Sequence, residues 1–202
     1  LIGIGATLIA EKEPDSDHPY GHGKFETLGA FVIGIMLFIT AFWILIEGYE
    51  RLVHRSVPNV TFITTSMMCL TIFINIFVYS YERKKGEELG STILIADSLH
   101  TRSDIYVSLS VLTGFVLIKL GLPIVDSLIA ISIAFLIMKM GYKIVKDASM
   151  ILTDTSFIDR EDEVKSLVLN VDGVLGCHNF RCRGKPGDIY ADIHIVVNPH
   201  IS

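Results

Sequence analysis

Charged residues are scarce in this chain. Of its 202 residues only 19% are Asp, Glu, Lys or Arg, whereas half are hydrophobic and the mean hydropathy is +0.52. Soluble domains carry about 25% charged residues, so this composition excludes an ordinary soluble globule. The 17 Lys and Arg are outnumbered by 22 Asp and Glu. They form no broad basic stripe, which argues against nucleic acid as a partner.

Cysteine is also rare. The three cysteines are Cys69, Cys177 and Cys182, without CxxC spacing, so neither a disulfide framework nor a cysteine-rich zinc site is expected. Cys177 and Cys182 lie five residues apart in one predicted strand. We expect them on opposite faces of that strand, which makes a bridge between them improbable.

Long uncharged runs are present instead. The stretch from Thr27 to Ile46 and the stretch from Asn59 to Ser80 contain no charged residue, and each is long enough to cross a bilayer. Two apolar segments that contain a few charged residues follow. A short Gly-Leu-Pro turn joins them and predicts an antiparallel helical hairpin. The predicted spans are 27–49, 59–81, 91–120 and 124–146, and residues 1–10 form about half a span. The chain therefore starts inside a helix, and we expect further sequence upstream.

Basic residues orient these spans. One side of the predicted membrane holds Lys12, Lys24, Arg83, Lys84, Lys85, Lys143 and Lys146, and the other holds Arg51, Arg55 and Lys119. The positive-inside bias makes the first side cytoplasmic. The loop at 11–26, a short loop at 82–90 and the C-terminal part are then expected in the cytoplasm.

The composition changes near residue 150. Residues 1–149 form the predicted transmembrane domain and residues 150–202 a small cytosolic domain. Apolar residues at helical spacing predict a helix over 159–171 with Asp159 as its N-cap. Period-two runs at 173–183 and 188–197, separated by Gly-Lys-Pro-Gly, predict a β-hairpin. This core is thin, so we expect an oligomerising module that is also cut short.

Three ionisable residues lie on one face of a predicted span. Asp97, His100 and Asp104 are three and four residues apart, so they fall within about two helical turns. Ionisable groups at membrane depth cost at least ~2.5 kcal/mol each and normally have a task there. An imidazole and a carboxylate suit a first-row divalent ion such as zinc, with further ligands from another helix. The alternative is an ion-pair network around Arg102 that only locks helices together.

A second constellation precedes the span that begins at Thr27. The loop Asp15-Ser-Asp-His18-Pro-Tyr-Gly-His22-Gly-Lys24 could present Asp15, His18 and His22 to one ion. It could equally be a tight turn with hydrogen-bonded histidines.

The remaining candidates are individually weaker. His178 and His194 sit one on each strand of the hairpin, where a surface histidine is the default reading. Asp126 is read as a helix-start or interhelical hydrogen-bonding group. Asp154, between the membrane and cytosolic parts, could pair with Lys24.

As a set, these residues resemble the cation diffusion facilitator family of divalent-metal transporters. The resemblance is carried by Asp17-His-Pro-Tyr-Gly-His-Gly-Lys-Phe-Glu26, by Ala96-Asp-Ser-Leu-His-Thr-Arg-Ser-Asp104 and by Gly173-Val-Leu-Gly-Cys-His178. It implies an all-α polytopic membrane bundle of six helices, with helix 1 and part of helix 2 absent here. A truncated ferredoxin-like α+β cytosolic domain (α-β-β-α-β) is expected to follow.

The resemblance also implies a function and assigns residues to it. The expected activity is efflux of a divalent cation, zinc foremost, in exchange for protons, by a homodimer in a bacterial or archaeal cell membrane. His100 and Asp104 match half of the transport site, with Asp97 on the same face; Asp15, His18 and His22 match a loop site, and His178 and His194 part of a cytosolic site. Lys24 and Asp154 resemble an inter-subunit charge interlock. Zinc is the expected substrate and a candidate regulatory ligand, without an organic cofactor.

Several alternatives stay open on sequence alone. The substrate could be iron, cadmium, cobalt or manganese, although an imidazole at His100 disfavours manganese. A non-transporting metal sensor or scaffold would use the loop and hairpin histidines but would not need His100 and Asp104 in a span. A membrane metallohydrolase would need an HExxH-type helix, which the sequence lacks, so an enzyme is not expected.

Overall fold

The computed structural model describes residues 2–54, 62–119, 122–156, 161–185 and 188–199. These residues divide into two compact units, Leu1–Ala148 and Ser149–Ser202. The first unit is helical and the second contains a short helix with a two-stranded antiparallel sheet. The predicted fold class, a helical membrane unit followed by a small α+β domain, is confirmed.

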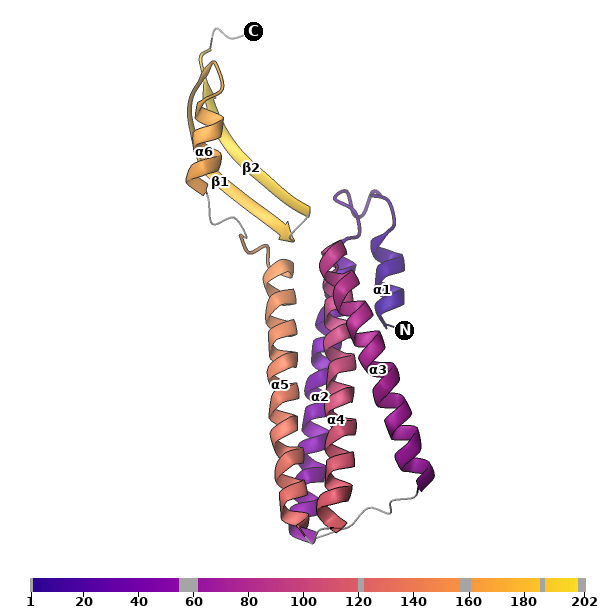
Figure 1. Cartoon of the computed structure of the whole chain (residues 1–202). Coiled ribbons are helices and arrows are strands. Elements are labelled where there is room, and N and C mark those ends of the chain that lie inside the picture. The colour runs from indigo at the N-terminus through magenta and orange to yellow at the C-terminus, as the bar shows by residue number, and fades with distance from the viewer. Residues whose placement is uncertain (1, 55–61, 120–121, 157–160, 186–187, 200–202) are drawn as a thin grey trace. The chain divides into compact units, whose positions relative to one another are not determined.

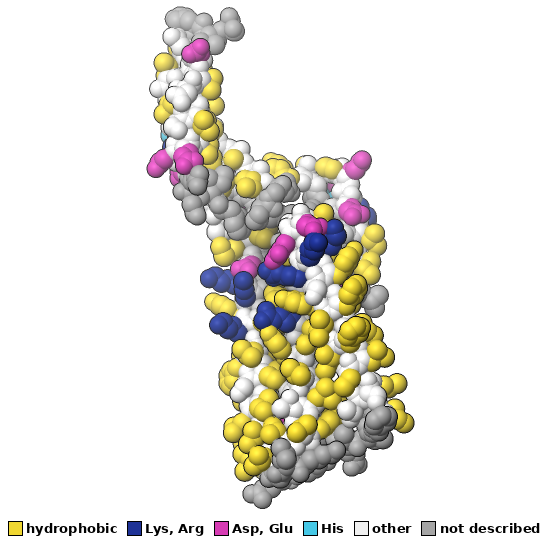
Figure 2. Space-filling model, viewed as in Figure 1, with side chains coloured by type: hydrophobic (Ala, Val, Ile, Leu, Met, Phe, Trp, Pro, Cys, Tyr) yellow, Lys and Arg dark blue, Asp and Glu magenta, His cyan; other side chains and the backbone are white. Residues whose placement is uncertain are grey.

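One short helix and four long ones build the first unit (Figure 1). They are α1 (Ile2–Ala10), α2 (Lys24–His54), α3 (Phe62–Leu89), α4 (Thr92–Lys119) and α5 (Pro123–Leu152). Among the described residues, α2, α3 and α5 are long and apolar enough to cross a membrane. At ~1.5 Å per residue each exceeds the ~30 Å hydrocarbon layer, so its ends reach the interfaces. Hydrophobic side chains cover much of this unit, with Lys and Arg gathered in a band (Figure 2).

The predicted cytoplasmic loop at 82–90 is wrong. Helix α3 continues to Leu89, and only Gly90 and Ser91 separate it from α4. Charged pairs at helical spacing stabilise this extension: Arg83 with Glu87 at 2.5 Å and Lys85 with Glu88 at 2.6 Å. The helix thus runs through the charged residues and ends at Leu89, before Gly90 with φ 61°.

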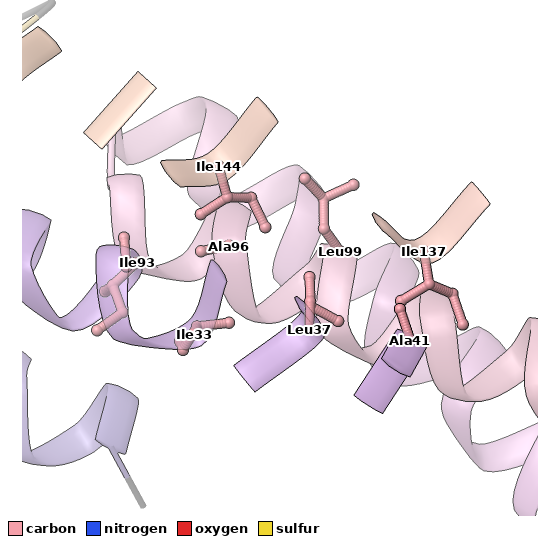
Figure 3. Close-up of a cluster of buried hydrophobic side chains, with 9 residues drawn as sticks. Ile33, Leu37, Ala41, Ile93, Ala96, Leu99, Ile137 and Ile144 are labelled. Atoms are coloured by element: carbon pink, nitrogen blue, oxygen red, sulfur yellow. The ribbon is translucent and has the colours of Figure 1, made fainter. Parts of the chain in front are cut away.

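Helices α2, α4 and α5 share one apolar core (Figure 3). It is made of Ala30, Ile33, Leu37 and Ala41 from α2, Ile93, Ala96 and Leu99 from α4, and Ile137 and Ile144 from α5. Glycines bring α2 and α5 especially close, since a methyl group on Gly141 would lie 3.0 Å from the carbonyl oxygen of Gly34. Small residues at such crossings let membrane helices pack by their backbones.

The second unit comprises α6 (Glu161–Leu169), β1 (Val174–Lys185) and β2 (Asp188–Val197). The hairpin forms where the period-two pattern predicts it, and α6 lies within the predicted helix. The expected N-cap Asp159 is outside the described residues.

A bulge corrects the prediction about the cysteines. The register shifts between His178 and Arg181, where Asn179 adopts φ 54°. Cys177 pairs with Ile195 and Cys182 with Ala191. Because those two partners are four residues apart on β2, the cysteines share a face. The expectation of opposite faces is wrong because it assumed unbroken alternation, but neither cysteine forms a disulfide.

Candidate metal sites

His100 and Asp104 lie one turn apart on α4, in the helical membrane unit. His100 Nε2 is 4.0 Å from Asp104 Oδ2, and the two side chains are 34% and 46% exposed. Zinc bound to both at ~2.0–2.2 Å would bring these atoms to roughly 3.3 Å apart, so a small side-chain rotation suffices. His100 Nδ1 is buried without a hydrogen-bond partner. Two of the ligands that a divalent ion needs are therefore adjacent on this helix.

Within the part of the chain that the structure describes, Arg102 contacts Tyr106 rather than His100 or Asp104. Its Nε donates to Tyr106 Oη at 2.7 Å, and its guanidinium lies 5.2 Å from the centre of the Tyr106 ring. Arg102 is therefore not positioned to pair with Asp104, as the purely structural ion-pair network would require.

Two further acidic residues flank the pair. Asp97 faces α1, since a methyl group on Gly3 would lie 3.3 Å from Asp97 Oδ2. Glu82 on α3 accepts a hydrogen bond at 2.9 Å from Oγ1 of Thr101, the residue that follows His100 in the chain. Sequence reasoning missed Glu82 because it opens the charged run that was taken as the end of a span. Its spacing on α3 gives no sign that it contacts α4.

The loop before α2 brings Asp15, His18 and His22 together. Their candidate ligand atoms lie within 4.8 Å of one another. His18 Nδ1 is 3.4 Å from Asp15 Oδ1, and His22 Nε2 is 3.4 Å from Asp15 Oδ2. His22 is only 7% exposed, and its Nδ1 has no hydrogen-bond partner. A buried imidazole beside a carboxylate and a second imidazole is a donor set that fits a divalent metal ion.

Backbone geometry shapes this loop. The N–H groups of Asp17 and His18 donate to Asp15 Oδ1 at 3.0 and 2.7 Å, and Gly21, at φ 84°, donates to the His18 carbonyl at 2.9 Å. The hydrogen bond from His18 N–H lowers the pKa of the Asp15 carboxyl. Asp15 is therefore ionised, as a metal ligand must be, even in mildly acidic solution.

This pKa shift gives the pH dependence of the loop a sign. A lowered carboxyl pKa favours the folded loop at neutral pH, and that contribution is lost only when the pH falls through the lowered pKa. Between about pH 7 and about pH 5 the Asp15 carboxylate therefore stays ionised and available as a metal ligand.

An Asp15→Asn variant separates the charge of Asp15 from its role in the turn. Asparagine keeps an oxygen that can accept from the His18 and Asp17 N–H groups, so the loop should retain its shape. We expect zinc affinity of the loop to fall about tenfold or more, measured by titration calorimetry. Asp17→Asn, which changes an exposed carboxylate of the same loop, is the matched control. Equal affinities in the two variants would contradict a metal role for Asp15.

His178 and His194 face each other directly across the hairpin. They are paired in the register, with ring centres 5.3 Å apart and nearly perpendicular planes. Asn179 Nδ2 lies 3.4 Å from His194 Nδ1. Within the described residues no third Cys, His or carboxylate completes a metal group with this pair, so the hairpin offers two ligands.

Asp154 adopts φ 55° and lies 3.8 Å from Arg183 of its own unit, measured from Oδ2 to Nη1. Lys24 is the first residue of α2. The interlock expected between Lys24 and Asp154 would join two copies of the chain and stays a prediction.

Helices long and apolar enough to cross a membrane, followed by a small α+β domain, are the architecture of a multi-pass membrane protein, and the His100–Asp104 pair offers it candidate ligands for a divalent metal ion. The comparisons agree with this class. Residues 1–153 match the family model described as the cation efflux transmembrane domain, and residues 158–202 match the cation efflux protein cytoplasmic domain. The chain belongs to the cation efflux, or cation diffusion facilitator, family of membrane transporters. Its predicted orientation, with the C-terminal part in the cytoplasm, is confirmed.

The chain is similar to several transporters, one of which is named for a particular metal. An uncharacterized transporter of Methanocaldococcus jannaschii is 35% identical over 203 residues, which cover all of this chain and 72% of the relative. Metal tolerance protein C1 of Arabidopsis thaliana is 32% identical over 217 residues, again all of this chain but 46% of the relative. The manganese efflux system protein MneS of Bacillus subtilis is 25% identical over 202 residues, all of this chain and 69% of the relative. The chain thus spans less than half of the plant relative and about 70% of the other two.

Proposed function

We propose that the protein exports a divalent metal cation, zinc foremost, by exchanging it for protons across the cell membrane. The observation that carries the proposal is the His100–Asp104 pair on α4, 4.0 Å apart and with an orphaned imidazole nitrogen. Ligands from another helix would complete the coordination of the ion. Family membership supports cation efflux, and the ligand pair supports the choice of metal.

Zinc is preferred because of the chemistry of the ligands. A neutral imidazole is a borderline nitrogen donor that suits zinc, iron or cadmium better than manganese, which prefers oxygen ligands. One relative is named for manganese efflux, so manganese, iron, cadmium and cobalt are the competing substrates of the proposal.

Proton exchange follows from the same atoms. The metal binds the unprotonated imidazole and the ionised carboxylate, so a proton and a metal ion compete for each ligand. A site that opens to a more acidic compartment therefore takes up protons and releases metal. Histidine is suited to this exchange because imidazoles titrate near physiological pH.

The test is metal flux in proteoliposomes containing the full-length protein. Zinc uptake should depend on an opposing pH gradient. Cadmium or iron should inhibit zinc uptake more strongly than manganese does. If the protein binds zinc at the His100–Asp104 site but moves none under any gradient, it is a membrane metal sensor or scaffold instead.

We further propose that the protein works as a homodimer in which the loop and hairpin sites tune transport. Both lie outside the spans, where ligands can rearrange, whereas a site at membrane depth cannot be bypassed. The small second unit exposes apolar side chains, among them Leu167 at 68%, Leu175 at 66% and Ile195 at 49%. A second copy is the expected cover for part of this surface.

Changing His178 and His194 together to Ala should therefore lower metal affinity about tenfold or weaken the dimer, while flux continues. Equilibrium dialysis and light scattering in detergent measure the two effects. His54→Ala, at the exposed end of α2, is a histidine-matched control. Loss of flux in the folded hairpin variant, with flux retained in His100→Ala, would reverse the ranking of the sites. A strictly monomeric full-length protein would overturn the dimer.

A further inference from the structure

An ion pair between a buried carboxylate and a partly exposed guanidinium joins α2 to α5 at the end of the bundle opposite the cytoplasm. Asp126, in the first turn of α5, is 5% exposed. Arg51 Nη1, in the last turn of α2, lies 3.6 Å from Asp126 Oδ2. The same guanidinium bonds Glu47 at 2.5 Å through Nη2. The sequence predicted an interhelical role for Asp126 but named no partner.

The Asp126 carboxylate also lies against a third helix. A methyl group built on Gly114 of α4 would come within 1.9 Å of Asp126 Oδ1. Gly114 is buried, and no side chain fits there unless the carboxylate or α4 moves. The Asp126 carboxylate, which pairs with the Arg51 guanidinium, therefore packs directly against the backbone of α4 at Gly114.

This contact bears on the helix that carries the transport ligands. Gly114 follows Asp104 by ten residues, which is about 15 Å along the helix. Ser110, one turn before Gly114, is 8% exposed and donates only within its own helix, to the Val107 carbonyl at 2.8 Å. The outer half of α4 therefore packs on its neighbours through small residues, with Asp126 as the charged group seated against it.

Charged groups inside a bilayer are costly and are retained for a task. A small residue in place of Asp126 would pack α4 and α5 together without that cost. The ion pair instead makes a contact that is strong while formed and can separate into the polar interface when the helices part.

We propose that Asp126 is a positioning residue for transport. Held by Arg51, it clamps the outer half of α4 to α2 and α5, and this clamp opens when the pathway opens to the outside. The inference rests on the proposed transport function and adds to it the contact that sets when α4 can move.

The test reports the position of α4 without relying on transport. In the full-length protein, Cys69, Cys177 and Cys182 are changed to Ser, and Ser110→Cys supplies one reporter thiol. Its reaction with a membrane-impermeant thiol reagent is followed from outside intact cells. Asp126→Asn, Gly114→Ala and Arg51→Gln should each raise the labelling rate about tenfold, whereas Arg51→Lys, which keeps the charge, should raise it less.

Thr113→Ala is the matched control, because Thr113 is exposed on α4 and donates only to Leu109 of the same helix. Zinc affinity of the His100–Asp104 site should stay within about twofold in all these variants, while flux falls in those that break the clamp. A labelling rate for Asp126→Asn and Arg51→Gln equal to that of the control would overturn the clamp. If labelling rises but neither parent nor variant moves zinc, the clamp stands and the proposed transport function fails. Faster labelling with unchanged flux would overturn the positioning role.

Discussion

Replacing Asp104 with alanine should lower zinc flux at least about 100-fold. Changing residues that only hydrogen-bond to metal ligands already costs about 10- to 100-fold in metal affinity or activity, and losing a ligand should cost more. The Asp104 carboxyl lies one helical turn from His100, with Oδ2 4.0 Å from His100 Nε2. The described part of α4 offers Asp97 as the other nearby carboxylate, but that group faces Gly3 of α1. Nothing on α4 is therefore placed to substitute for Asp104 without a rotation of the helix.

The measurement is zinc flux in proteoliposomes, with and without a pH gradient, beside zinc affinity in detergent. Asp192→Asn, which alters an exposed carboxylate of the cytosolic hairpin, controls for the loss of one negative charge. Undiminished, proton-coupled flux in the Asp104→Ala protein would show that the pair serves only to hold the bundle together.

A His100→Asp variant should admit manganese. The change replaces a borderline nitrogen donor with a hard oxygen donor, and two carboxylates on adjacent turns suit manganese better than zinc. Aspartate is shorter than histidine, so manganese can use the new oxygen ligand only if the ion binds closer to α4. The expected result is a shift of the manganese-to-zinc flux ratio by about tenfold or more, as a change of roughly 1.4 kcal/mol in relative affinity would give.

Competition assays in the same vesicles measure this ratio directly. Asp15→Asn serves as a control here, because the loop is proposed to tune transport rather than to select the metal. Unchanged metal preference in a folded and active His100→Asp protein would place selectivity on other ligands.

The fold was predictable where a pattern is repeated over many residues. Uncharged runs such as Thr27–Ile46 dictate membrane helices, and strict alternation after Asp188 dictates a strand. The predictions failed where a single residue changes the pattern. The bulge at Asn179 places both hairpin cysteines on one face, and the predicted loop at 82–90 is helix because Arg83 and Lys85 find carboxylates along the same helix.

The candidate sites show the same limit. Asp15, His18 and His22 lie within eight residues, and His100 and Asp104 within five. Their spacing in the sequence was therefore enough to predict that the members of each group lie close together. Glu82 with Thr101, and Arg51 with Asp126, join residues far apart in the sequence. A single sequence holds no record of such partners, because any of several helix faces could have met at those points.

The Arg51–Asp126 pair also bears on how the transporter responds to membrane voltage. Moving one elementary charge through the full field is worth about 2.3 kcal/mol per 100 mV. The guanidinium and the carboxylate lie 3.6 Å apart at the end of the bundle, beside the polar interface, so the displacement that separates them there crosses only a small part of the field. Voltage dependence should then arise from the metal ion and the protons that replace it, and the current per transported ion would report the proton stoichiometry.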